Sequence, residues 1–87
     1  MWTKRTKAAG VTWRTTVEGP AWRSIRYEGV IELHINDDDL ASYRSIVSVA
    51  QYGKISSHPL PDTTDLALAQ ARVEAKIKAM IGGGFHH

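Results

Sequence analysis

The chain has 87 residues, no cysteine and a formal net charge of +2. A chain of this length forms one domain with room for one sheet and one further layer, which leaves little space for a deep active-site cleft. The lack of cysteine excludes a disulfide framework, thiolate chemistry and cysteine metal sites, and no apolar run approaches the roughly 18 residues of a membrane span. We therefore expect a soluble, cytoplasmic protein with no membrane partner.

The charges are segregated along the chain. Residues 1–30 hold six Lys and Arg against two acids, residues 31–65 hold two against six, and residues 66–87 hold three against one. A basic beginning and an acidic middle complement each other, either within a monomer or between two copies, and a basic segment also attracts phosphate or an acidic protein. Ordinary solvated surface charge is the alternative interpretation.

Residues 1–10 (MWTKRTKAAG) show no sustained period and end in glycine, so we expect a flexible basic N-terminal arm. Lys4, Arg5 and Lys7 supply its charge. Such arms follow nucleic-acid backbones, although three charges fall below the usual basic cluster. A plain disordered terminus is the alternative.

The next two segments alternate with a period of two, which predicts strands. Residues 11–17 do so with β-branched side chains. Residues 21–35 are predicted to form one long strand, in which the odd positions from Ile25 onward are apolar or small while the even positions are mostly polar. One face of the long strand is therefore expected in a core and the other face open. A hairpin at Glu28-Gly29 would mix the two faces, so Gly29 is expected within a continuous strand, at a bulge or beneath a large neighbour.

The turn between these strands is predicted at residues 18–20 (Glu-Gly-Pro). A two-residue loop would mix core and solvent positions, whereas a three-residue loop keeps the apolar sides together. The preferred register places Trp13 opposite Ile25 and Val11 opposite Tyr27.

Residues 40–52 follow a polar break at residues 36–39 and are ambiguous. Several apolar positions have helical spacing, but the β-branched residues and serines of the SIVSV run favour a strand. As a strand, the segment would place Tyr43 opposite Leu33 and Val49 opposite Tyr27. A turn at residues 51–54 would lead to a short strand at residues 55–57, which the following prolines end.

The last element is predicted to be a helix capped by Asp62, with Asp65 at the third helical position. An apolar stripe marks its buried face: Leu66, Ala69, Val73, Ile77 and Met80. Three glycines at residues 82–84 are expected to end the helix with a left-handed cap.

Together these elements predict an α+β fold, an antiparallel meander of three or four strands with one C-terminal helix packed on one face. Residues 11–81 form the single domain and residues 82–87 a flexible tail. The predicted core is Val11, Trp13, Val17, Ile25, Tyr27, Ile31, Leu33, Ile35, Val47 and Val49 against Leu66, Val73, Ile77 and Met80. One helix cannot cover both faces of the sheet, so the second face is solvated or is an interface.

Arg14, Trp22 and Arg26 are predicted on this open face, with Trp22 opposite Thr16 and Arg26 opposite Thr12. Exposed tryptophan and arginine dominate protein-interface hot spots, which favours a protein partner or a second copy of the chain. The same residue types stack on bases and contact phosphates. The alternative is therefore a nucleic-acid surface made of Lys4, Arg5, Lys7, Arg14 and Arg26. A third interpretation is that the N-terminal residues cover Trp22 and that the arginines only add solubility.

No motif points to catalysis, a cofactor or a metal. Residues 37–39 (Asp-Asp-Asp) lack the spacing of a calcium loop and are expected to form a solvated turn. His34, His58 and the terminal pair His86-His87 offer no zinc framework. The serines lack a nucleophile elbow, so we expect a non-enzymatic protein.

Residues 27–34 (YEGVIELH), followed by a Pro-containing approach at residues 58–62 to an Ala-rich helix, resemble small domains common in phages and mobile elements. Many such proteins are accessory factors, and anti-CRISPR proteins among them occlude a protein complex. This resemblance implies a phage-type accessory protein. The layout is also similar to the βββα part of a double-stranded-RNA-binding domain, without that family's first helix and its Lys-rich helix entrance.

Overall fold

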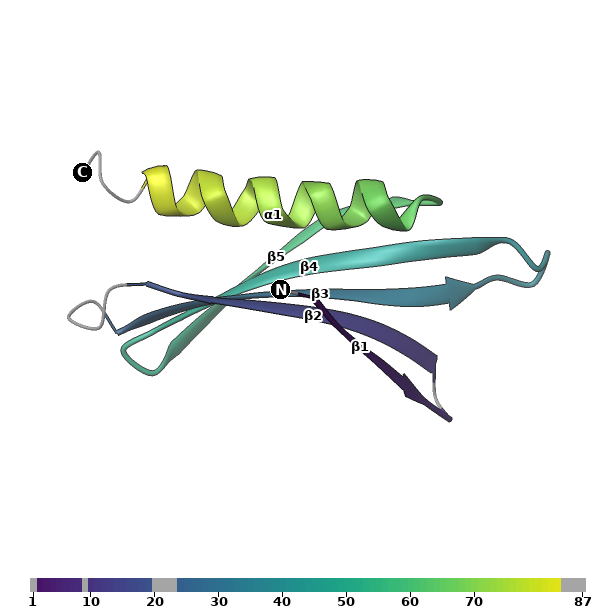
Figure 1. Cartoon of the computed structure of the whole chain (residues 1–87), viewed down its shortest axis with the longest axis horizontal. Coiled ribbons are helices and arrows are strands. Elements are labelled where there is room, and N and C mark those ends of the chain that lie inside the picture. The colour runs from purple at the N-terminus through teal and green to yellow at the C-terminus, as the bar shows by residue number, and fades with distance from the viewer. Residues whose placement is uncertain (1, 9, 20–23, 84–87) are drawn as a thin grey trace.

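The computed structural model describes residues 2–8, 10–19 and 24–83. In chain order the described residues form five strands and one helix: β1 (Trp2–Lys7), β2 (Gly10–Glu18), β3 (Ile25–Ile35), β4 (Ala41–Gln51), β5 (Lys54–Thr63) and α1 (Leu66–Gly83). Within the described ranges the strands form one antiparallel sheet in the order β1-β2-β3-β4-β5, with α1 on one side of it (Figure 1). The predicted α+β meander with a C-terminal helix is confirmed, with five strands in place of three or four.

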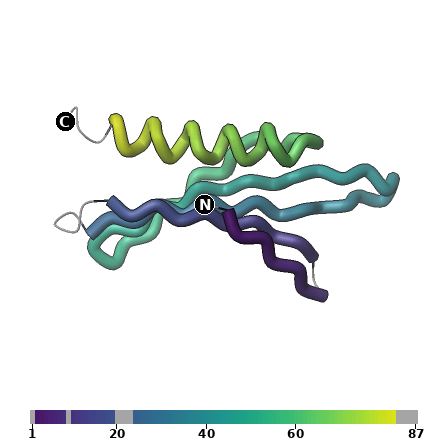
Figure 2. The backbone as a smooth tube through the Cα atoms, viewed as in Figure 1, coloured from purple at the N-terminus to yellow at the C-terminus, as the bar shows by residue number. Residues whose placement is uncertain are grey.

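The helix is not centred on the sheet. It runs along the long axis of the molecule, which measures 46 × 24 × 21 Å, and contacts mainly β3, β4 and β5. The β1–β2 hairpin diverges from the helix, whereas the β3–β4 hairpin continues beyond the helix (Figure 2). The sheet therefore has one face that α1 partly covers and an opposite face over which no described segment lies.

The strand interpretation of residues 40–52 is confirmed, and the helical alternative is wrong. Tyr43 pairs with Leu33 and Val49 pairs with Tyr27, as predicted. This register keeps apolar residues of both strands on the helix side, and β-branched side chains fit such a pleated, half-buried surface. The turn at residues 51–54 is also present, with positive φ at Tyr52 and Gly53 as a two-residue hairpin loop of type I′ requires.

The predicted register between β2 and β3 is wrong. Trp13 pairs with Ile31 rather than with Ile25, and Val17 pairs with Tyr27. The observed pairing differs by an even number of residues, so every side chain keeps its predicted face and the face pattern alone could not distinguish the two registers. The connection is longer than the predicted three-residue loop, because β2 ends at Glu18 and β3 begins at Ile25.

The prediction of a flexible N-terminal arm is also wrong, because Trp2–Lys7 form strand β1, which pairs antiparallel with β2. Trp2 lies on the helix side and packs against the core. Its Nε1 donates a hydrogen bond of 2.7 Å to Oε1 of Glu74 on α1. This contact ties the edge strand β1 to the helix.

The fifth strand is longer than predicted, since β5 runs through Pro59 and Pro61 to Thr63. Proline is tolerated there because β5 is an edge strand whose outer side needs no N–H donor. The helix consequently begins later, and its cap is Asp65 rather than Asp62. Asp65 Oδ1 accepts hydrogen bonds from the backbone N–H of Ala67 at 2.9 Å and of Leu68 at 3.4 Å.

The helix also ends later than predicted, because Gly82 and Gly83 are still helical. The remaining residues of the predicted tail, 84–87, lie outside the described part of the chain. A left-handed cap at Gly82 or Gly83 is therefore not formed.

The core lies between α1 and the helix-facing sides of β2, β3 and β4. Its buried apolar residues are Trp13, Tyr27, Ile31, Val47, Ala69, Val73 and Ile77. Most other predicted core residues pack around this cluster, joined by Trp2, Tyr43, Leu60 and Ile81, which the sequence did not indicate. The prediction that Ile35 belongs to the core is wrong, because this residue is 60% exposed. It belongs to the part of the β3–β4 hairpin that extends beyond the helix.

Gly29 sits in the middle of β3 beneath the helix, within a continuous strand, as predicted. A Cβ at this position would overlap Cγ1 of Val73 and lie 3.2 Å from Cγ2 of Thr15. The glycine thus allows α1 to approach the sheet closely, which seals the centre of the core.

We predict that Gly29→Ala lowers the free energy of unfolding by about 1–3 kcal/mol, because it overpacks this contact. Urea unfolding measures the effect, and Gly82→Ala is the matched control because nothing lies within 4 Å of its added Cβ. In the double variant Gly29→Ala/Val73→Ala the losses should not add, since the smaller side chain makes room for the new methyl group. Additive losses would contradict the contact.

Candidate functional site: the open sheet face

The register assigns the residues of the open face, which is the side of the sheet opposite α1. Alternate residues of neighbouring strands form rows across it. The rows are Thr3–Arg14–Val30–Ile46–Pro59, Arg5–Thr12–Glu32–Arg44, Thr16–Glu28–Ser48–Ser57 and Glu18–Arg26–Ala50–Ile55. Charged residues and threonines thus lie over β1 and β2. Apart from Arg44, the rows continue over β4 and β5 with serine, alanine, isoleucine and proline.

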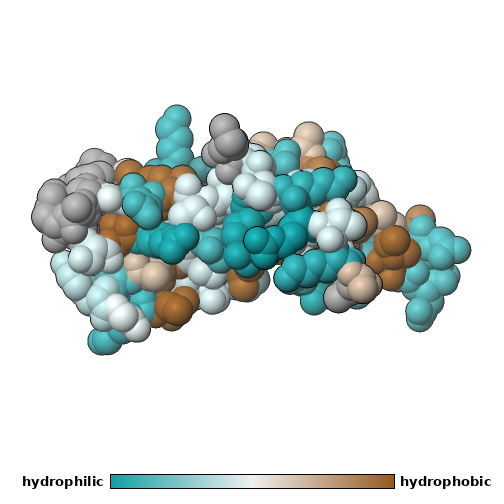
Figure 3. Space-filling model, turned by 60° about the horizontal axis from the view of Figure 1, so that its bottom comes forward, coloured by the Kyte–Doolittle hydropathy of each residue, from teal (hydrophilic) through white to brown (hydrophobic). Residues whose placement is uncertain are grey.

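Figure 3 turns the underside of the molecule in Figure 1 toward the viewer. Hydrophilic residues occupy the middle of this surface, and hydrophobic residues occur in separate spots (Figure 3). A surface of this composition stays hydrated on its own. It differs from the continuous apolar interface of an obligate dimer.

The open face is hollowed at the end where two hairpins separate. Pairing between β2 and β3 reaches its last pair at Thr12–Glu32, while β1–β2 continues to Lys7–Gly10 and β3–β4 continues to Ile35–Ala41. The two hairpin ends therefore diverge like a fork, which follows the twist of the sheet (Figure 1). The hollow between them has a volume of about 780 Å³.

Cations dominate the lining of this hollow, which we call the basic hollow. Its residues are Thr3, Arg5, Lys7, Gly10, Val11, Thr12, Arg14, Thr16, Glu32, Leu33 and His34. Arg5 and Lys7 are exposed and form no ion pair with any described residue. The hollow thus holds two arginines and one lysine against one carboxylate, that of Glu32, and threonine hydroxyl groups also line it.

Arg14 has an ion-pair partner on the open face, but the contact is loose. Its Nε lies 3.8 Å from Oε1 of Glu28, and the two side chains are 58% and 31% exposed. An exposed pair at this distance contributes little to stability. The guanidinium can therefore turn toward a ligand in the hollow without a large loss.

The structure separates Arg14 and Arg26, the two described residues of the predicted partner-binding set. Arg14 lies in the basic hollow, whereas Arg26 lies in the row of Glu18 at the opposite end of β3, so the predicted pair with Thr12 is wrong. Thr16 pairs with Glu28. Trp22 itself lies outside the described residues.

The placement of Lys4 in the predicted basic surface is also wrong, because its side chain points to the helix side of the sheet. Its Nζ lies 5.8 Å from the centroid of the Trp13 ring, a cation–π contact. The Trp13 ring meets the ring of Tyr43 edge-on, with centroids 5.7 Å apart. Of the predicted basic set, the structure groups Arg5, Lys7 and Arg14 and excludes Lys4 and Arg26.

Sequence reasoning missed Glu32, His34 and the threonines of the hollow. The alternation of Thr3, Arg5 and Lys7 was the available signal, but it acquires a meaning only once β1 is paired with β2. A second, smaller hollow of about 210 Å³ lies between β2 and α1, lined mainly by apolar atoms of Val17, Ile77 and Ile81.

Within the described ranges, no group of three or more His, Asp or Glu side chains is placed to hold a metal ion. Among the same residues, no helix has the length and apolar character needed to cross a membrane.

Comparison with protein-family models finds no matching family, and comparisons with curated proteins and with solved structures find no similar protein. The interpretation of the open face therefore rests on its geometry and charge.

We predict that Lys4→Ala and Arg5→Ala differ in their effect on stability although both remove one positive charge from β1. Loss of the cation–π contact should lower the free energy of unfolding by about 0.5–1 kcal/mol in the Lys4 variant. The Arg5 variant should stay within about 0.5 kcal/mol of the parent chain, because its side chain is exposed on the open face. Urea unfolding measures both, and an equal loss in the two variants would contradict the assigned faces.

Proposed function

We propose that this chain is a non-enzymatic binding module that holds an acidic segment of a protein partner on its open sheet face. The observation that carries the proposal is the convergence of Arg5, Lys7 and Arg14, from two strands, on one hollow of about 780 Å³. A role as a phage-type accessory protein stays a prediction.

The chemistry of the basic hollow suits carboxylates. Arginine guanidinium groups form paired, charge-assisted hydrogen bonds with a carboxylate, and lysine adds a mobile point charge. The hydroxyl groups of Thr3, Thr12 and Thr16 can donate further hydrogen bonds to the same oxygens. Cations gathered in a concave surface also steer an acidic partner toward it.

The edges of the sheet favour binding on its face over extension of the sheet by a partner strand. The edge strand β1 carries Lys4, Arg5 and Lys7, and the other edge strand, β5, carries Pro59 and Pro61. Charged residues and prolines on edge strands are the features that disfavour pairing with another chain.

Nucleic acid is the second candidate, because three cations in a groove also attract phosphate. Two features weigh against it. None of the described residues of the open face is Trp, Tyr or Phe, so the stacking platform of single-strand binders is missing from them. In addition, Glu18, Glu28 and Glu32 interrupt the basic surface along β2 and β3.

The test is fluorescence anisotropy with two labelled probes, an oligoglutamate peptide and a short mixed-sequence DNA duplex. We predict that the peptide binds the parent chain and that the variant Arg5→Glu/Lys7→Glu loses at least about tenfold in affinity, because repulsion replaces two charge-assisted contacts. The matched control is Lys54→Glu/Arg72→Glu, which changes the net charge equally at two exposed residues outside the hollow. This control should retain most of the affinity.

Two results would contradict the proposal. Equal losses in the hollow variant and the control would show that only net charge matters. Binding of the duplex in preference to the peptide, with a log–log salt slope near −3 as about three phosphate contacts would give, would assign the hollow to nucleic acid.

A further inference from the structure

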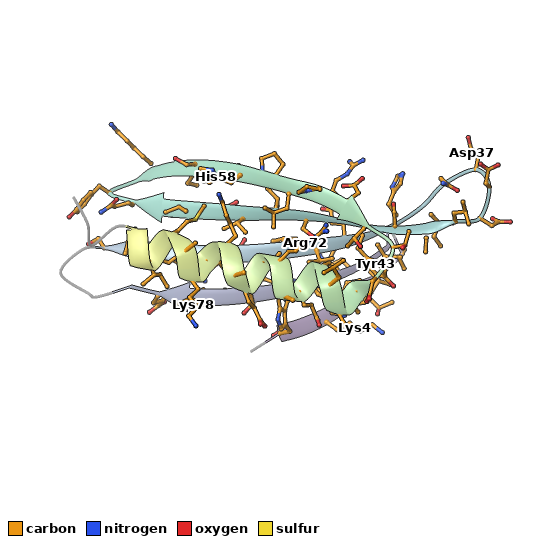
Figure 4. All side chains as sticks on the ribbon, turned by 90° about the horizontal axis from the view of Figure 1, so that it is seen from above. Lys4, Asp37, Tyr43, His58, Arg72 and Lys78 are labelled. Carbon is orange, nitrogen blue, oxygen red and sulfur yellow. The ribbon has the colours of Figure 1, made fainter. Side chains whose placement is uncertain are left out.

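The tip of the β3–β4 hairpin is an exposed acidic projection. Asp37, Asp38 and Asp39 are all exposed, and Figure 4 shows Asp37 at the far end of the hairpin, away from α1. We call residues 35–40 the acidic tip. It is the densest cluster of negative charge in the sequence, and nothing described in the chain lies against it.

Backbone hydrogen bonds hold the acidic tip in one shape. The backbone N–H of Asn36 donates to the carbonyl oxygen of Leu40 at 3.1 Å, and that of Asp39 donates to the carbonyl oxygen of Asn36 at 3.0 Å. Oδ1 of Asn36 accepts hydrogen bonds from the N–H of Asp38 and of Leu40, each at 3.0 Å. A tip that is already ordered loses little conformational entropy when it binds.

Two large apolar side chains flank the carboxylates. Ile35 is 60% exposed and Leu40 is 62% exposed, although the hairpin that carries them continues the strands of the core. The tip therefore presents apolar surface beside three negative charges, and burial of that surface would favour association.

The basic hollow is complementary to this tip. It offers the cations of Arg5, Lys7 and Arg14 opposite the three carboxylates of the tip. The tip of the same molecule cannot enter this hollow, because the tip continues outward from β3, whose residues Glu32–His34 form one wall. A second molecule is therefore needed to bring the two together.

We propose that the partner of the basic hollow is a second copy of this chain, which inserts its acidic tip between the diverging β1–β2 and β3–β4 hairpins. This inference rests on the function proposed above and names its partner. The β3–β4 turn and the β1–β2 turn lie at the same end of the molecule (Figure 1), and Arg5 and Lys7 of the hollow lie near the β1–β2 turn, so two copies related by a twofold axis can overlap their ends. Each copy then gives one tip and accepts one, and the assembly closes as a dimer.

The test exchanges the charges of the two surfaces. In the hollow variant, Arg5→Glu/Lys7→Glu, an acidic tip meets an acidic hollow. In the tip variant, Asp37→Lys/Asp38→Lys, a basic tip meets a basic hollow. Each variant alone should be monomeric by sedimentation velocity at concentrations where the parent chain dimerises at low salt.

A mixture of the two variants should dimerise again, because both contacts of the mixed pair join opposite charges. The controls change the same numbers of charges at exposed residues elsewhere: Lys54→Glu/Arg72→Glu and Glu18→Lys/Asp62→Lys. Each control should dimerise by itself like the parent chain. Circular dichroism checks that every variant is folded. If the tip variant is not, Asp37→Asn/Asp38→Asn replaces it in the single-variant measurement, where removal of the two negative charges should also weaken the dimer.

Three results would overturn the second-copy proposal: a parent chain that is monomeric at every concentration at low salt, variants that dimerise unchanged, or a mixture that stays monomeric. If the parent chain is monomeric but still binds oligoglutamate through Arg5 and Lys7, the inference fails while the proposed function stands. If it neither dimerises nor binds the peptide, both fail.

Discussion

The close contact between one helix and the centre of the sheet is the constraint on which the rest of the structure depends. Gly29 lets Val73 descend onto β3, so α1 is fixed over β3, β4 and β5. One helix is too narrow to cover five strands, and β1 and β2 extend past it. The opposite face must therefore remain compatible with water, and its charged and hydroxyl residues meet that requirement.

The same constraint places the charged elements at one end of the molecule. The β3–β4 hairpin continues beyond the helix and carries Asp37–Asp39, whereas the β1–β2 hairpin diverges from it and carries Arg5 and Lys7. Neither hairpin end has a hydrophobic layer to hold it against the other. Their separation opens the basic hollow, so the surface proposed to bind results directly from the limited reach of α1.

The sequence was most informative where apolar alternation was long. The eleven residues of β3 and the eleven of β4 define one register, and the prediction that Tyr43 faces Leu33 is confirmed. The β2–β3 register could not be deduced, because an even shift preserves both faces. Strand β1 was missed because Trp2 is its one large apolar residue. The candidate site was predictable only in part. The open-face position of Arg14 follows from alternation, whereas the placement of Arg5 and Lys7 beside it depends on the pairing of β1 with β2 and on the twist of the sheet.

The most direct test of the account is a titration of the isotope-labelled full chain with oligoglutamate, followed through its backbone amide NMR signals. The central claim, that the basic hollow is the binding surface, predicts that the largest shift changes occur in β1, in β2 and at Glu32–His34. The signals of α1 and β5 should change little. Shift changes centred on α1, or on the apolar hollow beside Ile77 and Ile81, would contradict the account.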